Sequence, residues 1–404
     1  MPDLTLIATV TIFIATYAVV AVGKVPVYRI DRAGAALLGG SLMLAIGVLT
    51  PQEAYRAIDF DTITLLLGMM IVVANLRVCG FFRLVTDWIA THVRRPLALL
   101  VAIALASGTL SAFLVNDTIC LVMTPLVLEL VTAVRRNPIP YLLAVATASN
   151  IGSVATITGN PQNIIIASLS QIPYGVFAGK LAPVAAIGLV ITVLLIALVH
   201  RGEFFTPERL EKVAMPTHHH GPLMAKTLIV MTVMIVLFFL GQPVAKVAIV
   251  GGAFLLFTRR VRPQKIYIEI DWPLLVMFVG LFVVVAGLEK MVLTPEVTAA
   301  GHLRLDNSAV LAGITAVLSN IVSNVPAVLL LKPFVPNLED AQRAWLIIAM
   351  AATFAGNFTL VGSVANLVVA QRAKARGVEI GFWAYFRVGA PLSLITIVIG
   401  LLLL

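Results

Sequence analysis

Long apolar runs are the feature that most limits what this chain can fold into. Ten of them reach or approach the ~20 residues that an α-helix needs to cross a bilayer. Only 12% of the 404 residues are charged, against about a quarter in soluble domains. The sequence therefore predicts an all-α polytopic membrane protein with the lipid bilayer as its surroundings. The runs cover about 4–22, 33–49, 61–76, 141–170, 181–199, 227–240, 244–258, 273–288, 345–370 and 390–404.

Two further apolar stretches, about 97–134 and about 308–335, each carry a group of polar residues in the middle. These groups read V-N-D-T at 115–118 and S-N-V-P at 323–326. We expect each arm beside a polar group to be shorter than a full span. Each stretch is therefore predicted to form a re-entrant helical hairpin, which enters and leaves the membrane on one side.

The basic residues of the short loops predict the orientation of the spans. Loops rich in Lys and Arg face the cytoplasm, and here they alternate with loops that carry Asp and Glu. Counting the spans between these loops places both termini outside the membrane. We expect this membrane to be a bacterial inner (plasma) membrane. Orientation also explains the net charge of +9, so no nucleic-acid partner is predicted. The loops expected inside carry Lys24, Arg29, Arg32, Arg77, Arg83, Arg94, Arg95, Arg135, Arg136, Arg259, Arg260, Arg262, Lys265, Arg372, Lys374 and Arg376.

One apolar run contains T-I-T-G-N-P-Q-N-I-I-I at 156–166. Glycine loosens a helix and proline removes a backbone donor, so the helix should break near Gly159–Pro161. Within the hydrocarbon layer, broken backbone is tolerated only where it is enclosed by protein or lines a watery cavity. The motif therefore predicts a cavity at this depth.

The two halves of the chain resemble each other in the order of their polar and glycine residues. Two inverted-topology repeats are predicted, each with five spans, one re-entrant hairpin and one broken helix (about 141–170 and about 345–370). The expected boundaries are 1–200, a cytoplasmic linker at 201–226, and 227–404. Secondary transporters have this pattern, with their site at the repeat interface, whereas a scaffold without transport would not need paired breaks. The pairs are Asp59/Asp271, Gly68/Gly280, Ala74/Ala286, Leu76/Leu288, Gly39-Gly40/Gly251-Gly252, Ser111/Ser319, Asn116/Asn324, Pro125/Pro333, Thr156/Thr359, Gly159/Gly362 and Asn163/Asn366.

The hairpin tips and the breaks supply the candidate binding residues. Carbonyl and carboxamide oxygens can replace the water shell of Na⁺, while hydroxyls and helix N-termini can hold an anion. Sodium is expected at Asn116, Asp117 and Asn163, and at Asn324 and Asn366. The full candidate set is Asn116, Asp117, Thr118, Thr156, Thr158, Gly159, Asn160, Pro161, Asn163, Ser323, Asn324, Thr359, Gly362, Ser363 and Asn366.

Asp117 has two interpretations. A carboxylate near the bilayer centre costs about 2.5–3.5 kcal/mol and needs a compensating partner. In the first interpretation it binds Na⁺ or a proton, which would couple ion flow to substrate movement. The alternative is a residue that caps the helix after the tip. Its counterpart in the second half is Val325, so a charge-based role would be asymmetric.

At these motifs the sequence resembles the ion transporter superfamily, which includes arsenite permeases, related sodium–proton antiporters, and divalent-anion:sodium symporters with a citrate-transporter-like domain. The resemblance covers essentially the whole chain and implies homodimers whose transport domain slides against a scaffold domain like an elevator. It rests on V-N-D-T-x5-T-P at 115–125, T-I-T-G-N-P-Q-N at 156–163, S-N-V-P at 323–326 and G-N-F-T-L-V-G-S-V-A-N at 356–366.

The departures from the family pattern bear on the substrate. Dicarboxylate members carry Ser-Asn-Thr at both tips, whereas here the tips read Val115-Asn116-Asp117 and Ser323-Asn324-Val325. This difference argues against di- and tricarboxylate transport. The tips resemble the arsenite and antiporter branch, whereas the G-N-P-x-N break resembles general anion permeases, so the substrate stays open.

These observations favour a Na⁺- or H⁺-coupled secondary active transporter of a small anion or metalloid oxyacid. A Na⁺/H⁺ antiporter without an anion substrate is the first alternative. An arsenite efflux permease is the second; it would need a separate ATPase partner, because the chain has no nucleotide-binding loop. No catalytic cluster is recognisable at membrane depth, so we expect no enzyme and no cofactor other than the coupling ion.

Overall fold

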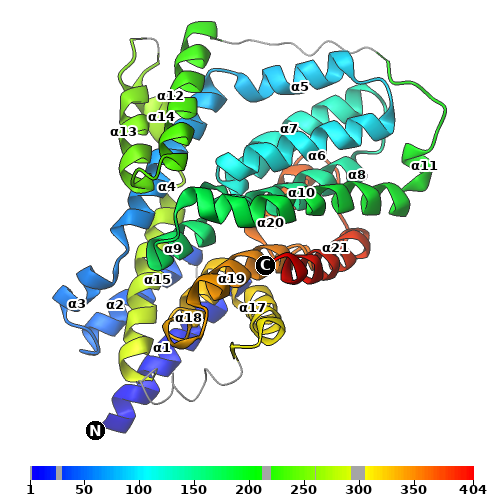
Figure 1. Ribbon diagram of the computed structural model, residues 1–404. Helices are drawn as coiled ribbons and strands as arrows, with labels where there is room; N and C mark the ends of the chain where they lie inside the picture. Colours follow the sequence, from blue (N-terminus) through cyan, green and yellow to red (C-terminus); the bar gives the residue numbers. More distant parts are fainter. Residues whose placement is uncertain (1, 24–29, 212–219, 260, 293–304) are drawn as a thin grey trace.

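The computed structural model describes residues 2–23, 30–211, 220–259, 261–292 and 305–404. Within these ranges every regular element is a helix (Figure 1). The predicted basic loop residues Lys24, Arg29 and Arg260, and part of the 201–226 linker, lie outside the described residues. The all-α polytopic prediction is confirmed, since eight described helices are long and apolar enough to cross a membrane. They are α1 (Pro2–Val22), α4 (Phe60–Val78), α6 (Pro96–Phe113), α7 (Asn116–Ala133), α10 (Tyr174–Val199), α12 (Gly221–Phe239), α15 (Trp272–Met291) and α21 (Phe382–Leu403).

Two matching helix crossings join the halves of the chain. Helix α2 (Arg32–Ala45) packs on α15, and α13 (Val244–Leu256) packs on α4. At the first crossing a side chain on Gly280 would clash with the backbone of Ala36, and at the second one on Gly68 would clash with the backbone of Ala248. Gly68 and Gly280 are partners in the sequence repeat. Because each crossing needs a glycine at the same repeat position, the duplication is visible in the packing itself.

The two predicted hairpins are unequal. Helices α6 and α7 meet at Leu114-Val115 and have 18 residues each, so the expectation that these arms are shorter than a span is wrong. The reason is that the polar residues of the tip start at Asn116 inside the first turn of α7 and do not shorten it. In the second hairpin, α17 (Ser308–Val322) has 15 residues and α18 (Asn324–Leu331) has 8, and they meet at Ser323.

Both predicted breaks are present. Helix α8 (Pro138–Ser153) stops before the short 3₁₀ turn η1 (Ile157–Gly159), and α9 (Pro161–Ser170) starts at the proline of the motif. Asn160 caps α9 by accepting a 2.8 Å hydrogen bond from the backbone N–H of Asn163. In the second half, α19 (Ala341–Ala355) and α20 (Val364–Lys374) are separated by residues 356–363.

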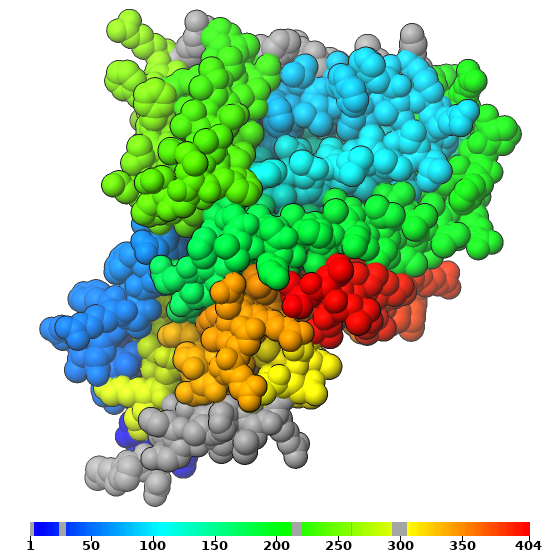
Figure 2. All heavy atoms as spheres, viewed as in Figure 1, coloured from blue at the N-terminus to red at the C-terminus, as the bar shows by residue number. Residues whose placement is uncertain are grey.

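The helices form two groups around these breaks. Figure 1 shows α2, α4, α12, α13 and α15 on the left and α5, α6, α7, α8, α10 and α21 on the right, while α9 and α18 are drawn next to α15. Helix α10 runs across the face in Figure 2 between the cyan helices of the first hairpin and the orange and red helices of the second half. The remaining elements are α3 (Pro51–Ala57), α5 (Phe81–His92), α11 (Arg201–Phe204), α14 (Pro263–Tyr267) and η2 (Val335–Asn337).

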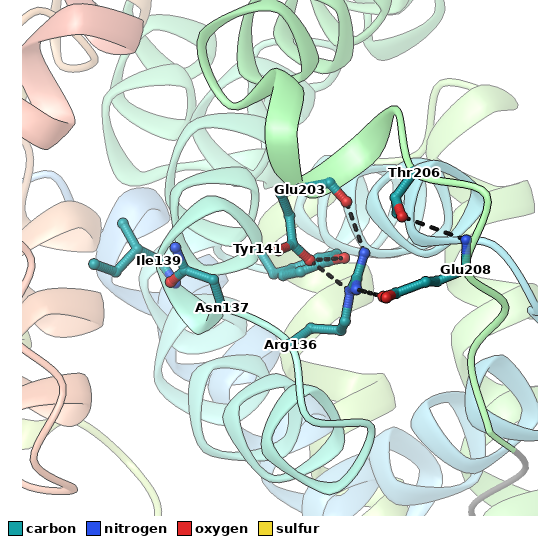
Figure 3. Close-up of polar contacts among 7 residues, drawn as sticks. All are labelled: Arg136, Asn137, Ile139, Tyr141, Glu203, Thr206 and Glu208. Carbon is teal, nitrogen blue, oxygen red and sulfur yellow. Dashed lines mark hydrogen bonds and ion pairs between the residues drawn. The ribbon is translucent and has the colours of Figure 1, made fainter.

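A polar cluster lies at the end of α7, away from the tip of the first hairpin (Figure 3). Arg136, between α7 and α8, donates to the carboxylate of Glu203 at 3.0 Å and to that of Glu208 at 2.9 Å. The hydroxyl of Tyr141 donates to the same Glu203 carboxylate at 3.0 Å. The cluster ties α8 and the end of the hairpin to α11, which follows α10.

Candidate functional site

Four helix N-termini converge on one narrow cavity of about 40 Å³, called here the narrow cavity. Its lining includes the first residues of α7 (Asn116), α9 (Pro161), α18 (Asn324) and α20 (Val364). Each N-terminus carries the positive end of a helix dipole, and the caps Asn160 and Ser363 already accept one first-turn N–H each in α9 and α20. Two of the four come from hairpins and two from broken helices, one of each from either half. The arrangement creates a positive potential that suits an anion or the oxygens of a polar solute.

Six residues of the sequence-based candidate set line this cavity. The lining also contains Arg32 and Gln162, which the sequence analysis did not select. Arg32 was interpreted as a loop charge that sets orientation, yet it is the first residue of α2 and its side chain reaches the cavity. The six candidates are Asn116, Asp117, Pro161, Ser323, Asn324 and Ser363.

A wider pocket of about 480 Å³, called here the wide pocket, adjoins the narrow cavity. The two share Arg32, Leu274, Met277 and Val364 in their linings. The wide pocket is lined further out by Asp31, Asp271 and Gln371, which belong to helix ends. The narrow cavity therefore has an approach from the side where α2 and α15 begin and α20 ends.

Asn150, near the end of α8, is the hydrogen-bonding centre behind the cavity. Its Oδ1 accepts from Asn116 Nδ2 at 2.9 Å, and its Nδ2 donates to Asn357 Oδ1 at 2.9 Å and to Asn366 Oδ1 at 3.1 Å. All four side chains are buried. One carboxamide thus connects the first hairpin tip to the second broken helix.

The second half makes a corresponding connection to the first broken helix through Thr353, which the repeat alignment pairs with Asn150. Thr353 Oγ1 accepts from Gln162 Nε2 at 2.9 Å and from Asn160 Nδ2 at 3.3 Å. Each half therefore uses the end of its own α8 or α19 to bond the broken segment of the other. Sequence comparison missed the pair because asparagine is matched with threonine, so no identity marked it.

Asn163 and Asn366 hold the two broken segments in the same way. Asn163 Nδ2 donates to the carbonyl oxygens of Thr156 at 2.9 Å and Ser153 at 3.2 Å. Asn366 Nδ2 donates to the carbonyl oxygen of Gly356 at 2.7 Å and to that of Thr359 at 3.2 Å. These carbonyls are the type of oxygen that the sequence analysis assigned to Na⁺. A cation there would have to displace the amide nitrogen and use the carboxamide oxygen. In Asn163 that oxygen is buried and has no hydrogen-bond partner among the described residues.

The other candidate residues lie behind or beside the narrow cavity and are absent from its lining. Thr156 donates its hydroxyl to the Ala112 carbonyl, and Thr158 lies 3.1 Å from the Tyr174 hydroxyl, so both brace the first break. A side chain on Gly159 would clash with the backbone of Ser153. The candidates that line neither cavity are Thr118, Thr156, Thr158, Gly159, Asn160, Asn163, Thr359, Gly362 and Asn366.

Ser323, at the tip of the second hairpin, has a left-handed backbone with φ of 79° and ψ of 161°. This region is sparsely populated by residues other than glycine and costs of order 1–3 kcal/mol. Strain of this kind is kept where the surroundings enforce it, and Ser323 lines the narrow cavity. The next residue is anchored, because Ser319 donates to Asn324 Oδ1 at 2.6 Å.

Asn116 and Asp117 give the cavity its acceptor groups. Asn116 Oδ1 is buried and has no hydrogen-bond partner in the part of the chain that the structure describes. Asp117 lies in the first turn of α7, but its carboxylate accepts no capping hydrogen bond from a backbone N–H among the described residues. The capping interpretation of Asp117 therefore has no contact to support it. Both groups are available for a cation or for a hydroxyl donor.

Comparison with known proteins gives one consistent result. The family model described as a citrate transporter matches residues 14–355. A 46 kDa membrane protein of Mycobacterium leprae is 30% identical over 98% of this chain and 97% of its own. The silicon efflux transporter LSI3 of Oryza sativa is 29% identical, covering 94% of this chain and 93% of its own. A putative transporter arsB of Dictyostelium discoideum is 25% identical, covering 92% of this chain and 86% of its own.

A solved structure agrees with the fold. The YdaH transporter of Alcanivorax borkumensis, described as having an unusual topology, superposes with a TM-score of 0.63 over 100% of this chain and 97% of its own. Its sequence is 14% identical, so the likeness concerns the fold alone.

Proposed function

The chain belongs to the citrate transporter family, and on that premise we propose that it is a secondary active transporter of a small anion or metalloid oxyacid, coupled to Na⁺ or H⁺. Family membership makes it a membrane transporter and not an enzyme. The observation that carries the finer proposal is the convergence of four helix N-termini from both halves on a cavity that also contains a carboxylate. Positive dipole ends suit the substrate, and the carboxylate suits its coupling ion.

The size of the narrow cavity favours a small solute. At about 40 Å³ the cavity is only a few times larger than the roughly 10–15 Å³ that one water molecule needs. The names of two relatives, a silicon efflux transporter and a putative transporter arsB, support an oxyacid of a metalloid. The absence of threonine at both tips supports the same choice.

Asp117 and Asn116 are the proposed coupling-ion ligands. A carboxylate in a membrane costs about 2.5–3.5 kcal/mol unless it is compensated, and Na⁺ or a proton would compensate it. The unpartnered Oδ1 of Asn116 adds a neutral oxygen ligand beside it. Because the second tip has Val325 in place of the carboxylate, coupling would use the first half only.

The movement we propose is of the elevator type, in a homodimer. The hairpins and broken helices, bound to each other through Asn150 and Thr353, would move as the transport domain against the group that contains α2, α4, α13 and α15. Both hairpins would be re-entrant, with the first opening inward and the second outward; for the first hairpin this rests on the loop charges, because each of its arms is long enough to cross a membrane. The wide pocket lies at helix ends that the basic loops assign to the cytoplasm, so this conformation would face inward.

Uptake into liposomes tests the proposal. Purified protein is reconstituted and offered arsenite, orthosilicic acid, arsenate or citrate under an imposed Na⁺ or H⁺ gradient. We expect uptake or efflux of at least one of the small oxyacids that depends on the gradient, and little movement of citrate. No movement of any probe under either gradient would contradict it. Transport by this chain alone, with no second protein in the liposomes, would also remove the need for an ATPase partner.

A Na⁺/H⁺ antiporter is the second candidate, because Asp117 is the sole acidic residue in the described lining of the narrow cavity. In such a protein one carboxylate exchanges a proton for Na⁺ and no anion is required. Proton movement on addition of Na⁺ alone, followed with a pH-sensitive dye in the same liposomes, would favour this function. Silence in that assay together with oxyacid transport would exclude it.

A further inference from the structure

Arg32 stands at the neck between the narrow cavity and the wide pocket. It is one of the residues common to both linings, and the shared neighbours Leu274, Met277 and Val364 are apolar. A solute that passes from the wide pocket to the four helix N-termini therefore passes the guanidinium. Helix α2, which carries Arg32, belongs to the group that packs with α15 and not to the hairpins.

Among the described residues, the charge of Arg32 has no close partner. No hydrogen bond or ion pair within 4 Å involves this side chain among the described residues. The guanidinium lies close to Gly23, where a Cβ would be 3.2 Å from Arg32 Nε. Asp117 belongs to the lining of the same narrow cavity, and Asp31 and Asp271 belong to the lining of the wide pocket. A half-buried guanidinium offers five donors, and those of Arg32 are free to bind the oxygens of an anionic ligand.

The same lining contains groups that can only accept. Asn116 Oδ1 is buried, unpartnered and acceptor-only, and an ionised Asp117 accepts on both oxygens. A ligand that fills the cavity therefore meets donors from Arg32 and the helix N-termini, and acceptors from the first hairpin tip. A fully deprotonated anion such as sulfate would satisfy the donors and repel the acceptors. A small oxyanion that keeps a hydroxyl group would satisfy both.

We infer that Arg32 is a substrate-binding residue that holds the anionic oxygen of a hydroxyl-bearing oxyanion, while Asn116 Oδ1 accepts from the hydroxyl of the same molecule with the lone pair that the coupling cation leaves free. This inference rests on the proposed function and deepens it, because it fixes the charge and the protonation of the substrate. It also makes the substrate a bridge between the α2–α15 group and the first hairpin in this conformation. A cation bound at Asp117 would remove the competing negative charge and strengthen the hold of Arg32 on the anion.

Thermal stabilisation of the purified protein tests the inference with small probes that differ in charge and in the number of hydroxyl groups. The probes are hydrogenarsenate and hydrogenphosphate, which keep a hydroxyl, sulfate, which does not, and arsenite, which is neutral at pH 7. The variants are Arg32→Gln and Arg32→Lys, with Arg95→Gln as a matched loss of one exposed charge away from both cavities. Each midpoint is measured against probe concentration in NaCl and in choline chloride.

We expect the unmodified protein to bind a hydroxyl-bearing anion more tightly than sulfate. Arg32→Gln should weaken that binding roughly 10- to 100-fold, the value of a charge-assisted hydrogen bond, and should leave arsenite binding within about threefold. Arg32→Lys should recover part of the loss, and Arg95→Gln should match the unmodified protein. Equal binding of hydrogenarsenate by Arg32→Gln and the unmodified protein would overturn the inference alone.

Two other outcomes keep the test decisive. Sulfate binding as tight as hydrogenarsenate binding in the unmodified protein would overturn the inference even if both Arg32 variants failed to fold. No stabilisation by any probe in the unmodified protein would count against the proposed oxyacid transport as well, which separates this failure from the failure of Arg32 alone.

Discussion

Asn150 on α8 donates its carboxamide nitrogen to Oδ1 of Asn366 on α20 at 3.1 Å, across the boundary between the two halves of the chain. Asn366 in turn donates to two carbonyls of the second break. The shape of one broken helix therefore depends on a side chain from the other half. Two segments more than 200 residues apart are held as one unit, at the level where the helix N-termini converge.

Loss of the Asn150 carboxamide should destabilise this unit. Asn150→Ala would leave Asn116 Nδ2 without its acceptor, and Asn357 and Asn366 without a donor. Each stranded buried group costs about 1–3 kcal/mol. We expect a marked fall in the thermal midpoint in detergent and loss of transport, whereas the exposed Ser41→Ala should change neither. An unchanged midpoint for Asn150→Ala would show that the hydrogen bonds do not hold the halves together.

Glycine is required at the two matching helix crossings. Gly68→Ala and Gly280→Ala would each place a methyl group against the backbone of the partner helix. Overpacking of this kind costs about 1–3 kcal/mol, and each variant should lower the midpoint by a similar amount because the crossings are equivalent. Gly179→Ala is the control, since nothing lies within 4 Å of its added carbon. Similar midpoints for all three variants would contradict the close approach.

Asp117→Asn tests the coupling role. The neutral amide is easier to bury than a carboxylate, so folding and membrane insertion should survive. We expect transport driven by a Na⁺ or H⁺ gradient to fall to background, while exchange of substrate across the membrane without a gradient is retained in part. Gradient-driven uptake in liposomes is the measurement, with the midpoint as the folding control. Full gradient-driven uptake by the variant would exclude the carboxylate from coupling.

The pair formed by Glu53 and Lys290 predicts a pH dependence of stability outside the site. Lys290 Nζ donates to the Glu53 carboxylate at 2.7 Å, and this bond, with further hydrogen bonds from Thr50, lowers the pKa of Glu53 to about 2. A folded-state pKa below the unfolded value of about 4.3 means stabilisation above pH 4.3, which is lost as the pH falls toward 2.

The variant Glu53→Gln checks this sign. Its thermal midpoint should lie slightly below that of the unmodified protein at pH 7, by a small amount because the pair is exposed. The difference should shrink as the pH is lowered from 5 toward 2. If the difference between the two thermal midpoints stays constant or grows in acid, the bond to Lys290 is not the cause of the low pKa of Glu53.

The sequence predicted the parts of the fold that depend on backbone chemistry. The break at Gly159–Pro161 followed from the loss of a donor, and the repeat followed from aligned glycines such as Gly68 and Gly280. These glycines proved to be the contacts where helices touch. The inequality of the hairpins was not predicted, because the sequence does not show that the polar tip begins inside α7.

The site was predicted in part, and its misses have a common cause. Residues at breaks and tips were selected because polar groups in apolar runs are conspicuous, and six of them line the narrow cavity. Arg32 was missed because it adjoins a basic loop, and Asn150 because its repeat partner is Thr353. The place of each residue in the site is set by the packing of helices that are distant in the sequence. Neither composition nor local spacing reveals this packing. The bonds of Asn163 to carbonyl oxygens likewise depend on the folded shape of the break.

A cryo-electron microscopy map of the purified protein with a transported oxyacid and its coupling cation tests the central claim most directly. The account predicts density for the solute between Asn116, Asn324 and Ser363, with the two hairpin tips approaching from opposite faces of the membrane. Solute density away from the four helix N-termini, or both tips entering from one face, would contradict it.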